Sequence, residues 1–304
     1  MALLCYNSAM QTTKILDIPF AVVTQSEALE KMESWLDAFR NHIIVTPNPE
    51  GVMQARRNGD FAHALKSADL SLADGTGIVL ASHLLKPRLP ERVRGVDTIF
   101  ALFELLSSNK RSFTAYFLGA APGVAEVAKA NMEARFPGLT VVGFHHGFFK
   151  LDSQEESRII SDINNLSPDI LLVCTGMPRA EIWAMRNRSI NCRLTLCLGG
   201  TLDIMGGKAK LAPRFFAKSG WSGCTGLSAS QNALNGCWTF RGLYLRLYFQ
   251  ERVVPDEQKN FVGLYFNFNG NIFAFLWNYC ILGTVGFGNG RIFGACDYYC
   301  VVFF

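Results

Sequence analysis

Residues 194–208 read Leu-Thr-Leu-Cys-Leu-Gly-Gly-Thr-Leu-Asp-Ile-Met-Gly-Gly-Lys, and this stretch decides the fold. An apolar run ends in Gly199-Gly200, and a lone acid, Asp203, and a second glycine pair follow. A short buried strand that ends in a glycine turn is typical of a parallel α/β sheet, in which ligands bind beyond the carboxyl ends of the strands. The stretch therefore predicts both a fold class and the edge of the sheet where function resides.

Apolar runs of the same kind recur through the first 220 residues and alternate with longer segments of helical periodicity. Strands are predicted at 43–46, 70–73, 115–118, 140–143, 170–173 and 194–197. Helices are predicted at 26–39, 51–65, 122–135 and 154–165. Alternating strands and helices predict an α/β domain with a Rossmann-like parallel sheet and helices on both faces.

The composition narrows the function classes. The 304 residues are 49% hydrophobic, which is ample for a core, and the net charge of +4 is too small to predict nucleic-acid binding. The start of the sequence has no charged region followed by a long apolar stretch, so no secretory signal is predicted. The cysteines of the first 220 residues are scattered, which favours a reduced, cytoplasmic protein.

Polar or glycine-rich turns follow five of the predicted strands. They occupy 46–51, 74–77, 119–123, 175–178 and 199–203. One such turn is weak evidence, because glycine commonly ends a strand. Five turns on one predicted edge favour a ligand pocket.

Asp74 and the Thr46-Pro47-Asn48 segment each allow two interpretations. Asp74 precedes two glycines, and it is either a helix N-cap or a general base that takes a proton from an attacking hydroxyl. Pro47 fixes the backbone beside Thr46 and Asn48, either in an ordinary turn or to present a hydroxyl and an amide to a ligand.

Three further motifs bear on phosphate and metal binding. Arg92-Val93-Arg94 precedes a predicted helix and is either a phosphate site or a solvated basic loop. The turn at 119–123 matches neither of the usual glycine fingerprints for nucleotides. His145-His146 is interpreted as packing or surface, because no third ligand stands at a suitable spacing, and no Asp-x-Asp occurs to hold a metal-bound diphosphate. No metal site is therefore predicted, and Cys174, inside a strand, is expected in the core.

Taken together and in order, these turns resemble the WecG/TagA/CpsF glycosyltransferase family over roughly residues 12 to 220. The matching motifs are Thr46-x-Asn48, Ala73-Asp74-Gly75-x-Gly77, Arg92-Val93-x-Gly95-x-Asp97, Gly176-x-Pro178-x-x-Glu181-x-Trp183, Gly199-Gly200-Thr201-x-Asp203 and Gly207-Lys208 before Ala212-Pro213.

The resemblance implies an enzyme that moves N-acetylmannosamine, or a related sugar, from a UDP-sugar to a polyprenyl-diphosphate-linked N-acetylglucosamine in cell-surface polysaccharide synthesis. It implies inversion, no cofactor and no metal. It also makes Asp74 the candidate base, with Thr46 as the second catalytic candidate. The candidate substrate-binding residues are Asn48, Gly75, Gly77, Arg92, Gly95, Asp97, Gly176, Pro178, Glu181, Gly200 and Asp203.

Two departures from the family pattern leave an alternative open. Ala180 stands where the family usually has glutamine before Glu181, and Leu211 stands where it often has arginine. A catalytically weak nucleotide-binding module with the same fold is therefore a second hypothesis. A nicotinamide-dependent oxidoreductase is disfavoured, because the glycine fingerprint is absent.

The last quarter of the chain, 221–304, has a different composition. It holds five of the nine cysteines and eleven of the 24 phenylalanines, and no strand or helix periodicity organises it. Loss of one base just after the Gly220 codon explains this change of composition. In the restored reading frame, each codon takes the third base of one residue's codon and the first two bases of the next. Cys237 and Trp238 then give only leucine, and Trp238 and Thr239 give only aspartate. With permitted codon choices, the restored frame encodes an arginine-rich tail like that of the family and reaches a stop codon near Asp256.

We therefore predict a catalytic domain over 1–220 and an irregular, out-of-frame tail over 221–304. A membrane span over 261–287 is disfavoured by its asparagines and glycines. The native tail is expected to mediate peripheral contact with the inner face of a bacterial membrane, and a homo-oligomer is left open.

Overall fold

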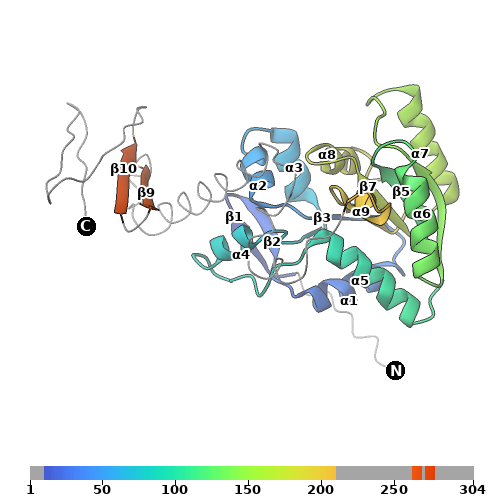
Figure 1. The fold of residues 1–304 in the computed structure, drawn as a ribbon, viewed down its shortest axis with the longest axis horizontal. Helices are drawn as coiled ribbons and strands as arrows, with labels where there is room; N and C mark the ends of the chain where they lie inside the picture. Colours follow the sequence, from blue (N-terminus) through green and yellow to red (C-terminus); the bar gives the residue numbers. More distant parts are fainter. Residues whose placement is uncertain (1–9, 210–261, 269–270, 278–304) are drawn as a thin grey trace, which may run out of the picture.

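The computed structural model describes residues 10–209, 262–268 and 271–277. Its centre is a six-stranded sheet in the order β4-β3-β8-β7-β5-β6, with every neighbouring pair parallel. Figure 1 labels β3, β5 and β7 of this sheet, with helices around them. The strands are β3 (His42–Val45), β4 (Leu70–Ser71), β5 (Phe113–Gly119), β6 (Leu139–His145), β7 (Ile170–Cys174) and β8 (Leu194–Cys197). All six predicted strands are confirmed, with ends that differ by a few residues.

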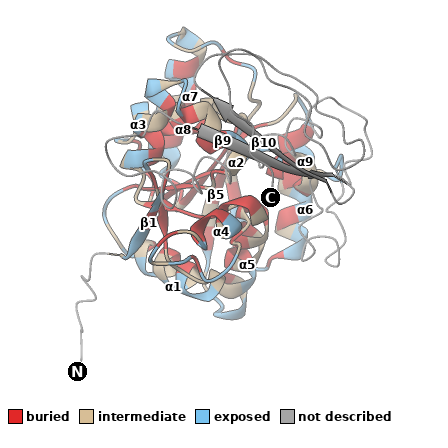
Figure 2. Ribbon diagram, turned by 90° about the vertical axis from the view of Figure 1, so that its left-hand side faces the viewer, coloured by how far each residue is buried: buried red, intermediate tan, exposed pale blue. Residues whose placement is uncertain are grey.

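The central strands are buried from end to end. Every residue of β3, β7 and β8 is buried, as expected for a parallel sheet that is covered on both faces. Figure 2 shows buried residues gathered in the interior of the domain, between the helices. Successive side chains point to opposite faces, so Ile43 and Val45 pack in one apolar cluster while Ile44 packs in the other.

Helices cover both faces of the sheet, as predicted. The first cluster takes side chains from α2 (Pro49–Ala55), α3 (Gly59–Ser67), α4 (Thr76–Ser82), α7 (Gln154–Leu166) and α8 (Arg179–Arg186). The second takes them from α1 (Gln25–Trp35), α5 (Gly95–Ser108), α6 (Val124–Arg135) and α9 (Thr201–Met205). The two clusters together form the core of the domain.

Capping explains the one predicted helix that the structure divides. The helix predicted at 51–65 is two helices, because Asn58 caps α3: its side-chain oxygen accepts a hydrogen bond from the backbone N–H of Phe61 at 3.0 Å. The apolar spacing continues across this break, so periodicity alone could not reveal it. The helix predicted at 26–39 begins at Gln25, behind a capping box of Thr24 and Glu27, and ends at Trp35.

Several short elements were not predicted. Strands β1 (Thr12–Ile15) and β2 (Ile18–Ala21) form an antiparallel hairpin, and helices α4, α8 and α9 have only seven, eight and five residues. The three helices span about two turns or fewer, and the two strands have four residues each, so none is long enough to show a clear period in the sequence.

A second hairpin lies within the region that the sequence predicts to be irregular. Strands β9 (Val262–Phe268) and β10 (Asn271–Trp277) pair antiparallel. The proposed site of the base loss and most of 221–304 lie outside the described residues. Among the residues that the structure describes, no helix is both long enough and apolar enough to cross a membrane.

Candidate functional site

The chain leaves neighbouring strands toward opposite faces at the centre of the sheet. From β3 it continues into α2 on one face, and from the adjacent β8 it continues into α9 on the other. In open α/β sheets such a reversal is where ligands bind, just beyond the carboxyl ends of the strands. Thr46 and Asn48 follow β3, Asp74 follows the next strand, β4, and Gly200 follows β8.

Asp74 follows β4 and makes non-covalent contacts with the start of α5 and the loop before it. One carboxylate oxygen lies 3.4 Å from an Nη of Arg92, and the other accepts the backbone N–H of Gly95 at 3.3 Å. The following helix, α4, has Gly75 at its N-cap and no side-chain cap. The N-cap interpretation of Asp74 is therefore wrong, because Gly75 is the N-cap of α4 and Arg94 is the N-cap of α5.

Opposing effects act on the Asp74 carboxyl. Removal from water raises its pKa, and Arg92, the Gly95 N–H and Arg94 act to lower it, with a net upward shift. Its side chain keeps 28% of its surface exposed. The group is thus a reachable carboxylate with a raised pKa, as expected of a general base. The sequence did not single out Arg94 for this electrostatic role.

The N-terminus of α5 packs against the ends of two strands. A Cβ added at Gly95 would lie 2.8 Å from Leu198 and 2.9 Å from both the hydroxyl and the methyl group of Thr46. The Thr46 hydroxyl donates to the carbonyl of Cys197, at 3.3 Å. Glycine at position 95 thus lets the helix approach Thr46 and brings Thr46, Asp74 and Arg92 to one place.

Asn48 and the turn after β7 extend this arrangement. The side-chain oxygen of Asn48 caps α2 by accepting the Gly51 N–H at 2.8 Å. Gly51 is close to the Met177 sulfur, which would be 2.6 Å from an added Cβ. Gly75, with φ of 135°, stands next to Pro49 and Asn48. The motifs after β3, β4 and β7 therefore meet, and Met177 is a contact that the sequence did not indicate.

Glu181 lies deeper than the other candidates. It is 5% exposed on α8, and its Oε2 atom has no hydrogen-bond partner among the described residues. Burial raises its pKa from 4.5 to about 7. Glu181 is also close to Cys197, and its negative charge raises the pKa of that thiol in addition to the effect of burial. The structure therefore places Glu181 in the packed layer beneath the strand ends.

The remaining candidates are less closely connected. Asp97 pairs with Arg94 at 3.4 Å on the first turn of α5, and Gly77 is buried in the first turn of α4. Gly200 is exposed and begins α9. Asp203, on α9, is near Cys174, where it adds to the effect of burial in raising the pKa of that buried thiol.

Gly176 and Pro178 form the turn between β7 and α8. Gly176 has φ of 82°, and the Met177–Pro178 peptide bond is cis. Within the described residues, a Cβ at Gly176 would meet nothing within 4 Å. Ala180, which follows, is 1% exposed in the first apolar cluster, and its side chain faces the core.

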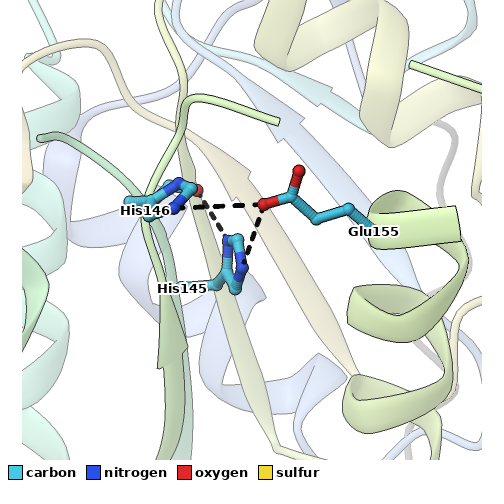
Figure 3. Close-up of side chains that lie close together, drawn as sticks. All are labelled: His145, His146 and Glu155. Atoms are coloured by element: carbon cyan, nitrogen blue, oxygen red, sulfur yellow. Dashed lines mark hydrogen bonds and ion pairs between the residues drawn. The ribbon is translucent and has the colours of Figure 1, made fainter. Parts of the chain in front are cut away.

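His145 and His146 do have a third potential ligand. Glu155 Oε1 lies 3.6 Å from His145 Nε2 and 3.9 Å from His146 Nε2 (Figure 3). The expectation that no third ligand was available is wrong, because Glu155 comes from the next element, α7, and not from the same segment. Only the packing of α7 beside β6 brings the three side chains together.

Comparison with known proteins gives a consistent assignment. The family model described as "Glycosyl transferase WecG/TagA/CpsF family" matches residues 13–223. The chain is 30% identical over 207 residues to the N-acetylglucosaminyldiphosphoundecaprenol N-acetyl-beta-D-mannosaminyltransferases of Staphylococcus aureus strains MRSA252 and NCTC 8325 / PS 47. Each match covers 67% of this chain and 79% of the relative. The chain therefore belongs to the WecG/TagA/CpsF family of glycosyltransferases.

Proposed function

We propose that this glycosyltransferase moves N-acetylmannosamine from a UDP-sugar to a polyprenyl-diphosphate-linked N-acetylglucosamine, with inversion. The staphylococcal relatives, named for the N-acetylmannosaminyl group and for an undecaprenol-diphosphate-linked N-acetylglucosamine, support this choice of sugar and acceptor. In the reaction the acceptor oxygen bonds to the anomeric carbon, the bond from that carbon to the UDP oxygen breaks, and the acceptor proton passes to the enzyme. One such displacement inverts the configuration.

The position of Asp74 is the observation that carries this proposal. It is a partly exposed carboxylate at the carboxyl end of the sheet, next to a cation and the N-terminus of α5. Its raised pKa suits it to take the proton of the attacking hydroxyl. Thr46, whose hydroxyl would lie 2.9 Å from a Cβ added at Gly95, is the neighbouring group that would orient the donor or the acceptor.

Arg92 and the backbone amides of the strand-end turns would hold the diphosphate of the donor. A guanidinium can bind two phosphate oxygens at once, and the N-terminus of α5 adds a positive field. Arg92 approaches Asp74 at 3.4 Å, so the leaving group and the base would lie on either side of one cation. These groups can stabilise the departing UDP without a metal.

Replacing Asp74 with asparagine tests the proposal. With UDP-N-acetylmannosamine and a polyprenyl-diphosphate-linked N-acetylglucosamine, we expect turnover to fall at least about a hundredfold while UDP affinity changes little. Near-normal turnover in the variant would remove Asp74 from the mechanism. UDP binding by the parent chain with no transfer to any acceptor would favour the nucleotide-binding module instead.

We further propose that 1–220 is the catalytic domain and that 221–304 is out-of-frame translation. The family match ends at residue 223, close to the proposed base loss, which supports this division. An arginine-rich native tail would hold the enzyme at the inner face of the membrane, where its lipid-linked acceptor resides.

Sequencing the gene around the Gly220 codon tests the base loss, and vesicle sedimentation of a repaired chain tests membrane association. Size-exclusion chromatography of the same chain would show whether it forms a homo-oligomer.

A further inference from the structure

Three side chains that have no role in the proposed transfer reaction form a cluster near the carboxyl end of β6. His145 ends β6, His146 follows it, and Glu155 lies in the first turn of α7. The side chains point toward one another from two elements (Figure 3). Their ligand atoms all lie within 4.8 Å of one another, and each side chain keeps 28–45% of its surface exposed.

Hydrogen bonding fixes which nitrogen of His145 faces Glu155. Nδ1 of His145 lies 2.8 Å from the carbonyl oxygen of His146, and a carbonyl oxygen can only accept, so Nδ1 carries the proton. In the neutral ring, Nε2 therefore presents a lone pair to the Glu155 carboxylate, 3.6 Å away. In the neutral ring two electron-pair donors face each other, and either a proton on Nε2 or a metal ion between them would turn this repulsion into attraction.

The same hydrogen bond is one that metal-binding histidines commonly make. A ligating imidazole usually donates its other N–H to a carbonyl or a carboxylate, which fixes the tautomer and the direction of the ring. His145 is held in this way before any metal arrives, and its ring also packs at 6.3 Å from the Phe149 ring.

His146 requires a small rearrangement to become the second nitrogen ligand. Its Nδ1 accepts the Phe148 N–H at 3.3 Å, so in the neutral ring Nε2 carries the proton. Ligation by Nε2 moves that proton to Nδ1 or releases it, and the Phe148 N–H must find another acceptor. The bond is long and Phe148 is 72% exposed, so water can replace it.

We propose that His145, His146 and Glu155 form a binding site for a zinc-class divalent ion, with water in the fourth position. Two imidazoles and one carboxylate are a ligand set that zinc uses in proteins, at about 2.0–2.2 Å from each ligand atom. At those lengths tetrahedral ligand atoms lie about 3.3 Å apart. The distances of 3.6 and 3.9 Å to Glu155 must therefore close by about 0.3–0.6 Å, and the pair of imidazole nitrogens, which lies within 4.8 Å, by up to about 1.5 Å. The ion would tie the end of β6 to α7.

Cobalt(II) titration of the full chain, after removal of metals with EDTA, tests the site. We expect the parent to bind one ion that gives a visible spectrum of nitrogen and oxygen ligation, without the charge-transfer bands of thiolate. This distinction matters because the chain has nine cysteines that could also bind the ion. Zinc should displace the cobalt and raise the melting temperature.

Three variants separate the site from background binding. His145→Ala and Glu155→Gln should each weaken this ion at least about tenfold and abolish the zinc-dependent rise in melting temperature. His63→Ala removes an exposed histidine from α3 and should behave as the parent does. If the parent gives no nitrogen and oxygen spectrum, or if His145→Ala and Glu155→Gln bind the ion as the parent does, the proposal is wrong.

Discussion

Glu181 should make the stability of this protein depend on pH in a way that one substitution removes. Its carboxyl is 5% exposed, and burial raises its pKa from 4.5 to about 7. The folded state therefore holds a proton that the unfolded state releases between these two values. The stabilising contribution is fully present below about pH 4.5 and is lost as the pH rises through about 7.

The size of the effect follows from the shift in pKa. Each pKa unit corresponds to about 1.4 kcal/mol, so a shift from 4.5 to about 7 corresponds to about 3–4 kcal/mol at most. Between pH 5 and pH 8 the parent should lose about 2–3 kcal/mol of unfolding free energy through this group alone. Glu181→Gln has no proton to lose and should lack that part of the pH dependence.

Urea unfolding followed by circular dichroism at pH 5 and pH 8 measures this difference. The glutamine variant is compared with itself at the two pH values, so any constant cost of burying an amide cancels. Glu30→Gln, at an exposed position on α1, controls for the general effect of losing one carboxylate. An equal loss of stability in the parent and in Glu181→Gln would show that the Glu181 carboxyl does not hold its proton in the fold.

Three further outcomes are expected. Gly95→Ala should destabilise the fold by about 1–3 kcal/mol in urea unfolding, because its Cβ would lie 2.8–2.9 Å from Leu198 and Thr46, whereas Gly59→Ala, with nothing within 4 Å, should cost nothing. Arg92→Gln should move the acidic limb of the pH–rate profile to higher pH, since Arg92 lowers the Asp74 pKa; an unmoved limb would exclude Asp74 as the titrating base. Transfer by a repaired enzyme should survive EDTA, and strict dependence on magnesium or manganese would count against a metal-free diphosphate site.

The strands of the fold could be predicted from sequence because each is an apolar run bounded by a turn. All of β3, β7 and β8 is buried, and burial on both faces requires such runs. The short helices could not be predicted in the same way. The five residues of α9 owe their position to contacts with α6 and to the turn after β8, and neither contact is visible as a period in the sequence.

The sequence predicts which residues lie at the strand ends, but it does not predict the contacts that they make there. The order of turns correctly indicated that Thr46 and Asp74 lie at one edge of the sheet. That Asp74 bonds to Gly95 depends on where α5 begins, 21 residues later. Glu181 had the same motif-level support as Asp74, and only the packing of α8 separates a buried carboxyl from a partly exposed one.

In the proposed reaction, Asp74 would have two coupled roles, one in holding the N-terminus of α5 and one in accepting a proton. Its carboxylate accepts the Gly95 N–H and faces Arg92, so it fixes the first residue of α5 while it remains charged. In the proposed reaction it gains a proton at the moment when UDP departs with its negative charge. Protonation weakens its hold on Gly95 and on Arg92, because both interactions are strongest with the anion. The α5 N-terminus and the guanidinium would then be released toward the diphosphate, so that proton transfer to Asp74 and stabilisation of the leaving group occur together.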